Sequence, residues 1–204
     1  MKYERLDDSR GFSLIEILMV VAIFAVVSAI AVPQMGKLFG FYKLSGDARS
    51  VSNAIAGAKM RAAADFSRVR IFADLSANAF YMQVWDKTLN SGAGGWRTEG
   101  GSTNLSANVT FGYAGITTPP GGTQSTMGQA PQCTADDGTN IANTACVMFN
   151  SRGVPVDVTL APTSADAMYL TDSPSTAVYG ITVAATGMIR SWQTPSASTH
   201  WVLN

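Results

Sequence analysis

One carboxylate, that of Glu16, lies inside a long apolar segment near the start of the chain. The segment opens at Phe12 and continues without another charged residue to Val32, and Pro33 follows it. Because an ionised carboxylate is costly in a low-dielectric environment, a Glu in such a segment generally has a partner and a functional role. The chemistry that this residue predicts is therefore charge pairing.

The apolar segment is long enough to be a membrane helix. It has 21 residues, from Phe12 to Val32, and a helix of that length spans about 31 Å, close to the thickness of a bilayer core. A short polar leader that ends in Gly11 precedes it and carries Lys2, Arg5 and Arg10. Since basic residues set the orientation of a membrane helix, we expect this leader in the cytoplasm and everything after Pro33 across the membrane.

Three interpretations of the segment compete. The first is an ordinary N-terminal anchor. The second is a secretory signal peptide with Ala29-Ile30-Ala31 as its small-residue cleavage site, although a charge within the apolar core of a signal peptide is unfavourable. The third rests on a resemblance. The run Gly11-Phe12-Ser13-Leu14-Ile15-Glu16, followed by an unbroken apolar helix, resembles the cleavage and methylation motif of type IV pilins and pseudopilins.

That resemblance implies a specific processing event. A membrane peptidase would cut after Gly11 on the cytoplasmic side and methylate the new amino terminus, that of Phe12. The apolar helix would stay attached, and Pro33 falls where many members of the family have a helix-kinking proline. This interpretation accounts for Glu16, and we prefer it to the other two.

The role expected for Glu16 follows from this processing. Its carboxylate would lie one helical turn beyond the new amino group of Phe12, and a paired buried charge is tolerated where a single one is not. The amine belongs either to the same chain or to a neighbouring subunit, and the sequence leaves both alternatives open. Pairing between subunits would set their axial register in a filament. We therefore expect Glu16→Ala to leave processing intact and to impair incorporation.

Composition argues against several other functions. The 204 residues include 14 basic and 14 acidic side chains, and His200 in the C-terminal tail is the only histidine. A global basic excess, typical of nucleic-acid-binding proteins, is missing from this sequence. No Ser/His/Asp set, Gly-rich phosphate loop or paired-carboxylate motif stands out. We therefore predict a protein that is not an enzyme and has no cofactor.

The two cysteines, Cys133 and Cys146, favour a disulfide because the expected location is oxidising. Closing a loop of this size would contribute about 3 kcal/mol in the chain-entropy model. The alternative is two free thiols. Two cysteines and one histidine make a poor zinc site. The segment from Asp136 to Asn140 has oxygen ligands suited to Ca²⁺, but Asp-Gly and Asn are also ordinary turn residues, so no metal is predicted.

The rest of the chain predicts an α+β fold, in which a long N-terminal helix packs on an antiparallel β-sheet. Val51, Ile55, Ala58 and Ala62 recur at helical spacing between residues 47 and 64, with Lys59, Arg61 and Asp65 off this stripe. Alternating or short apolar runs then predict strands. These strands are 69–73, 80–85, 109–113, 146–149, 167–170, 178–184 and 188–192. The stretches 90–104 and 116–145 are predicted to be loops, and Gly187 is expected in a left-handed turn.

A second, looser resemblance concerns the C-terminal half. The segments Phe149–Pro155 and Thr186–Arg190 are similar to the GspH/FimT-like branch of minor pilins and pseudopilins. Members of that branch lie at or near the filament tip, help to begin assembly and serve type IV pili or type II secretion. Some bind DNA through a basic cluster after the equivalent of Gly187. Here Arg190 is the single cation between residues 188 and 192, which argues against DNA binding.

The sequence therefore predicts a minor pilin or pseudopilin, without deciding between a pilus and a type II secretion system. The expected parts are a leader (1–11), a transmembrane and filament-core helix (12–33), its amphipathic second half (34–66) and a β-rich extracytoplasmic domain (67–204). The expected partners are other pilins or pseudopilins, the prepilin peptidase and the inner membrane, in which the precursor is a single-pass protein.

Two alternatives from other classes remain at this point. The first is a binding module displayed on the filament, an adhesin or a DNA receptor, which a basic surface stripe would favour. That stripe would be formed by Arg68, Arg70, Arg97 and Arg152. The second is a secreted enzyme released after Ala31, which needs a catalytic cluster that the sequence does not show.

Overall fold

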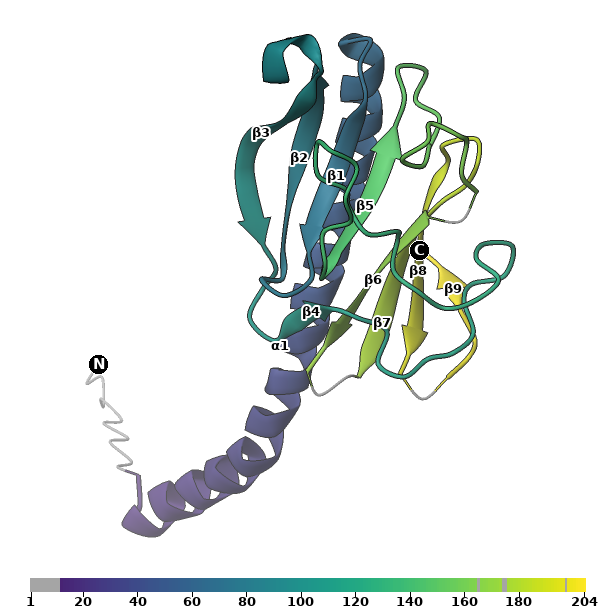
Figure 1. Ribbon diagram of the computed structural model, residues 1–204. Coiled ribbons are helices and arrows are strands. Elements are labelled where there is room, and N and C mark those ends of the chain that lie inside the picture. The colour runs from purple at the N-terminus through teal and green to yellow at the C-terminus, as the bar shows by residue number, and fades with distance from the viewer. Residues whose placement is uncertain (1–11, 165, 174–175, 197) are drawn as a thin grey trace, which may run out of the picture. The chain divides into compact units, whose positions relative to one another are not determined.

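Figure 1 shows the computed structural model of the chain, which describes residues 12–164, 166–173, 176–196 and 198–204. The chain divides into two compact units, one that extends to Phe39 and one from Gly40 to Asn204. A single helix, α1 (Leu14–Ala64), contributes to both units.

The second half of α1 has the amphipathic character that the sequence predicted. Apolar residues at helical spacing along this half are completely buried, because they face the strands that follow. They are Leu44, Ala48, Val51, Ile55, Ala58 and Ala62. One core therefore joins the helix to the strands, with Ile71, Phe149 and Ile181 among its other fully buried members.

The strands form two antiparallel sheets, which Figure 1 shows side by side along the helix. The first has the order β3-β2-β1-β5 and the second the order β4-β6-β7-β8-β9. The members of the first are β1 (Val69–Asp74), β2 (Ala79–Asp86), β3 (Gly95–Asn104) and β5 (Thr144–Phe149). The members of the second are β4 (Val109–Phe111), β6 (Asp166–Asp172), β7 (Ala177–Val183), β8 (Ile189–Pro195) and β9 (Val202–Leu203). The α+β class is confirmed, and the expected sheet is divided into two.

The prediction that residues 90–104 form a loop is wrong. This stretch holds a short 3-10 turn, η1 (Asn90–Gly92), and the long strand β3. Because β3 is an edge strand with β2 as its one strand neighbour, most of its side chains are exposed, and its sequence lacks an apolar alternation. Pairing of Trp96 with Trp85 and an ion pair between Glu99 and Arg61 hold it in place.

The long predicted loop between β4 and β5 is ordered against the second sheet. The carboxamide of Gln129 makes two hydrogen bonds with the backbone of Tyr169 in β6, as a neighbouring strand would. The hydroxyl of Tyr169 donates to Gln124 at 2.8 Å, and the indole of Trp201 donates to the carbonyl of Thr118 at 2.8 Å. The loop and the C-terminal segment thereby cover a small second core around Tyr169 and Val178.

Candidate functional site

The first turn of α1 places Glu16 against the backbone that precedes it. The N–H of Ser13 donates to the carboxylate of Glu16 at 3.1 Å, and the carbonyl of Ser13 accepts from the N–H of Glu16 at 3.0 Å. A Glu at the third helical position that reaches back to the N-cap is one half of a capping box. Within a single chain, the carboxylate therefore already has a local partner.

Ser13 is a residue that the sequence interpretation missed. The signal was present, because Ser-x-x-Glu directly before an apolar run is typical of a helix N-terminus. The carboxylate of Glu16 therefore carries a charge and also accepts a hydrogen bond at the helix start.

The apolar segment of α1 offers a continuous hydrophobic surface. From Leu14 to Val32 its mean hydropathy is 2.8, and by length and composition it is able to cross a membrane. Its large apolar side chains are all exposed in the isolated chain, from 49% for Val20 to 78% for Leu14. An exposed apolar surface of this extent marks a site of contact with a membrane or another protein.

Gly11, Phe12 and Pro33 are the other residues predicted for the N-terminal processing site. Gly11 and the leader lie outside the described residues. Phe12, the expected new N-terminus, is 84% exposed and precedes the capping residue Ser13. The backbone of α1 is helical through Pro33, and a kink at that residue stays a prediction.

The expected basic stripe does not form a continuous cationic surface. Arg70 is only 3% exposed, because the loop that holds the disulfide covers it. Its guanidinium donates to Gln83 at 2.8 Å and to the carbonyl of Thr134 at 2.7 Å. It also lies 3.9 Å from the ring centroid of Trp96. Burial lowers the pKa of Arg70 to about 10. Through its hydrogen bonds, Arg70 holds the disulfide loop on the first sheet.

The other arginines of that stripe have different surroundings and do not form one surface. Arg97 pairs with Asp86 at 3.5 Å, so its charge is compensated. Arg68 and Arg152 line one cavity at the end of the first sheet. Arg190 is exposed on β8, where its guanidinium donates to the sulfur of Met188. The arrangement therefore does not favour the DNA-receptor alternative, since affinity for DNA grows with the number of cations along its backbone.

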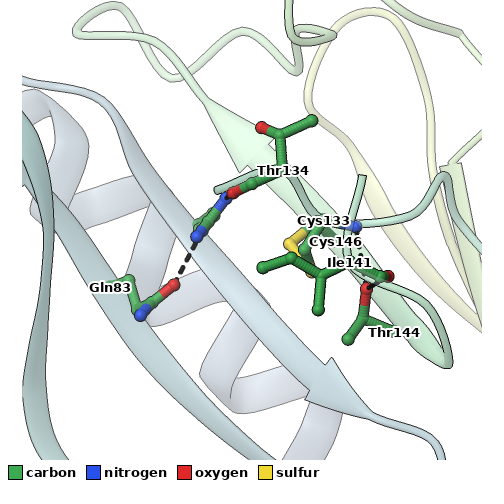
Figure 2. The surroundings of a disulfide bond; sticks show 7 residues. Gln83, Cys133, Thr134, Ile141, Thr144 and Cys146 are labelled. Carbon is green, nitrogen blue, oxygen red and sulfur yellow. Dashed lines mark hydrogen bonds between the residues drawn. A yellow bond between two sulfur atoms is a disulfide. The ribbon is translucent and has the colours of Figure 1, made fainter. Parts of the chain in front are cut away.

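The predicted disulfide between Cys133 and Cys146 is present, with 5.0 Å between the two Cα atoms. Figure 2 shows its surroundings. The hydroxyl of Thr144 accepts from the N–H of Cys133 at 3.0 Å and donates to the carbonyl of Ile141 at 2.6 Å. The bridge and these hydrogen bonds fix the loop that covers Arg70. In the part of the chain that the structure describes, no three His, Cys, Asp or Glu side chains gather at a metal site.

Comparison with known proteins agrees with the N-terminal site. Residues 7–32 match the family model of the prokaryotic N-terminal methylation motif. The match covers the segment whose resemblance to type IV pilins and pseudopilins the sequence indicated, and it confirms that resemblance. Among curated proteins, none matches this chain.

Two solved structures are similar to the chain at low sequence identity, and both are of the minor pseudopilin EpsH from the type II secretion system of Vibrio cholerae. One is 11% identical, covers 76% of this chain and 99% of its own, and has a TM-score of 0.46. The other is 12% identical, covers 73% of this chain and 92% of its own, and has a TM-score of 0.41.

Proposed function

We propose that the chain is a minor pilin or pseudopilin, a structural subunit and not an enzyme, that is stored in the inner membrane and assembled into a filament. One observation carries the proposal. The methylation motif at residues 7–32 coincides with a helix whose apolar side chains are all exposed from Leu14 to Val32. A membrane buries such a surface in the precursor, and neighbouring helices bury it in a filament core.

The processing step follows from the same motif. The prepilin peptidase cuts after Gly11, frees the amino group of Phe12 and methylates it. The carboxylate of Glu16 is then the nearest acidic group in sequence to that new positive charge. In the membrane the capping hydrogen bond from Ser13 stabilises this carboxylate. In the filament the amine of a neighbouring subunit is its partner, and this pairing sets the axial register.

The remaining parts of the proposal concern location and partners. The basic leader keeps the N-terminus in the cytoplasm before cleavage. The β-rich domain then lies in the periplasm or on the outside of the filament, where an oxidising environment supports the disulfide between Cys133 and Cys146. The partners are other pilins or pseudopilins, and a place in initiation or at the tip is part of the proposal.

Mass spectrometry of the mature N-terminus tests the proposal directly. The full chain is expressed with an active prepilin peptidase and, as the control, with a catalytically inactive one. We expect a methylated Phe12 with the active enzyme and a retained leader with the inactive one. A mature chain that begins at Val32 would show a signal peptide instead, and a chain that keeps Met1 in both strains would show an ordinary anchor.

A further inference from the structure

A cavity of about 400 Å³ lies at one end of the first sheet, where β1 begins and where β2 and β5 end. Arg68 precedes β1, Lys87 follows β2 and Arg152 follows β5. The antiparallel pairing of β1 with both neighbours brings these three residues to the same end of the sheet. We call the cavity that they line the basic pocket.

Among the described residues, no ion pair compensates the charge of the basic pocket. The lining residues that the structure describes include no Asp or Glu. The carboxylates nearest in sequence to Arg68 and Lys87 are engaged elsewhere. Asp65 pairs with Arg61 at 3.1 Å, and Asp86 pairs with Arg97 at 3.5 Å. Within the described residues, no ion pair involves any of the three pocket cations. Three positive charges therefore share one cavity in a chain that is neutral overall.

The side chain of Arg68 is held in a position from which it can bind a ligand. Its guanidinium carbon lies 4.0 Å from the ring centroid of Trp85. A stacked guanidinium keeps its N–H donors free in its own plane, in the geometry that suits carboxylate and phosphate oxygens. Arg68 is partly buried, and this burial removes part of its hydration and lowers its pKa.

Two polar residues add donors to the same cavity. Ser151 lines it with a hydroxyl, and Asn150 lines it with a carboxamide. The carboxamide oxygen of Asn150 already accepts hydrogen bonds from the backbone of Arg152 and Val154. The amide nitrogen of Asn150 is a donor only, and it adds to the positive character of the pocket.

One simpler explanation of these cations is the end of α1. The negative end of a helix dipole attracts basic side chains, and α1 ends at Ala64, close in sequence to Arg68. The dipole does not explain Phe66, which also lines the pocket, is 78% exposed and has a left-handed φ of 51°. Glycine is the usual residue at such a position. A bulky aromatic that breaks this local rule at the rim of a pocket points to a function there.

We propose that the basic pocket binds one anionic oxygen group, a phosphate or a carboxylate, with Arg68, Lys87 and Arg152 as its charged contacts and Phe66 as its apolar rim. A single group fits better than a polyanion. The arginines beside the pocket on the same sheet are buried, as Arg70 is, or paired, as Arg97 is. They leave no continuous track of cations that a nucleic-acid backbone would need. The pocket is independent of the filament function proposed above.

An NMR titration of the full chain in detergent micelles tests this proposal. The signals to follow are the indole N–H of Trp85 and the backbone amides of Ser151 and Arg152. Inorganic phosphate and succinate are added in separate series, and sodium chloride at matched ionic strength corrects for screening. We expect saturable shifts confined to the pocket with at least one of the two probes, and the more effective probe identifies the source of the anion.

Charge-neutralising variants supply the comparison. Lys87 and Arg152 are exposed, so Lys87→Gln and Arg152→Gln are expected to fold normally. Each should weaken binding about tenfold or more, as the loss of one charge-assisted contact requires. Arg49→Gln removes the same charge from an exposed site on α1, about 23 Å along the helix from Ala64, and should leave binding unchanged.

Three results would overturn the proposal. The first is shifts that do not saturate with either probe. The second is equal weakening by Arg49→Gln and the pocket variants, which would show a general charge effect. The third is a response to a thymidine oligonucleotide without a response to phosphate or succinate, which would show a distributed polyanion surface.

Discussion

The ammonium group of Lys59 donates a hydrogen bond to the carbonyl oxygen of Gly187 at 2.9 Å. Lys59 belongs to α1, and Gly187 belongs to the turn between β7 and β8. The aliphatic part of the same side chain lies against Gly153, in the turn that follows β5. One lysine therefore connects the helix to turns that belong to both sheets.

Adding a methyl group at Gly187 tests this close packing. A Cβ there would lie 2.5 Å from the carbonyl oxygen of Gly153 and 3.0 Å from the ammonium group of Lys59, and the φ of Gly187 is +73°. Both the backbone conformation and the contacts oppose an alanine. We expect Gly187→Ala to lower the free energy of unfolding by roughly 2–4 kcal/mol, measured by urea denaturation of the full chain in detergent.

Gly122→Ala is the matched control for this change. Gly122 has nearly the same φ, +74°, but an added Cβ would meet nothing within 4 Å. Its cost is therefore the left-handed conformation alone, about 1 kcal/mol. Equal losses in the two variants would contradict the argument that packing of the two turns against Lys59 decides the effect.

The same contact illustrates what the sequence was able to predict. The left-handed turn at Gly187 was predicted correctly, because Ala-Thr-Gly between two apolar runs is a local signal. The buried stripe of Val51, Ile55 and Ala58 was also predicted, because helical periodicity is local. The bond from Lys59 joins residues 128 positions apart. No local pattern encodes this hydrogen bond. Helical periodicity predicts only that Lys59 lies off the apolar stripe.

The candidate site also has a part that local sequence signals predict and a part that depends on tertiary contacts. Glu16 was conspicuous, because a single charge in an apolar run is a strong signal, and the match of residues 7–32 agrees with it. The expected basic stripe failed because two of its arginines, Arg70 and Arg97, have partners that only the tertiary structure brings to them. Asp86 pairs with Arg97 from another strand, and the carbonyl of Thr134 reaches Arg70 from the disulfide loop.

A substitution at Phe66 is expected to raise the free energy of unfolding, whereas the substitution at Gly187 lowers it. It follows the end of α1 with a φ of 51°, and the N–H of Ser67 bonds to the carbonyl of Ala62, as in a Schellman motif. Phe66→Gly should raise the free energy of unfolding by about 1 kcal/mol, because glycine adopts this conformation without strain. Thermal unfolding followed by circular dichroism measures the change.

Phe66→Ala separates the backbone from the ring at this position. Alanine removes the aromatic side chain and keeps a Cβ, so the strain remains and no gain in stability is expected. Because the ring is 78% exposed, its removal costs little burial. If alanine stabilised the protein as much as glycine did, exposure of the ring and not the left-handed backbone would be the cause.

The disulfide is expected to stabilise the domain that it closes. Cys133 and Cys146 are 13 positions apart in sequence, and a loop of this size is worth about 3 kcal/mol in the chain-entropy model. The double variant Cys133→Ser/Cys146→Ser should unfold at a lower urea concentration by a corresponding amount. Wild-type protein in dithiothreitol should behave like the variant. An unchanged midpoint under reducing conditions would contradict this prediction.

Acid should destabilise the protein through a set of exposed aspartate turns. In each turn an aspartate accepts hydrogen bonds from the hydroxyl and the N–H of a Ser or Thr two positions on. The hydroxyl bond is the main cause that lowers the pKa of these carboxyls. They are Asp74, Asp86, Asp137 and Asp157.

The sign of this effect follows from linkage. A carboxyl whose pKa is lower in the folded state stabilises the protein above the unfolded pKa of about 4, and this contribution disappears as pH falls through the folded value. Asp166 acts in the opposite direction, because burial raises its pKa. Urea midpoints measured from pH 7 to pH 2.5 should therefore fall at the acid end, and less steeply in Thr159→Val. Stability that rises toward pH 3 would show that Asp166 dominates.

Glu16 allows its two proposed roles to be separated by one pair of variants. Glu16→Gln keeps an oxygen that accepts the N–H of Ser13, since glutamine also forms a capping box. It removes the charge that would pair with the amine of Phe12 in a neighbouring subunit. Glu16→Ala removes the hydrogen-bond acceptor and the charge.

We expect the two Glu16 variants to be processed normally by the prepilin peptidase and to be depleted from sheared filaments, because incorporation depends on the charge. Mass spectrometry measures processing, and quantitative immunoblotting of the filament fraction measures incorporation. If Glu16→Gln were incorporated like the wild type while Glu16→Ala was not, the carboxylate would act as a helix cap and the register role would be wrong.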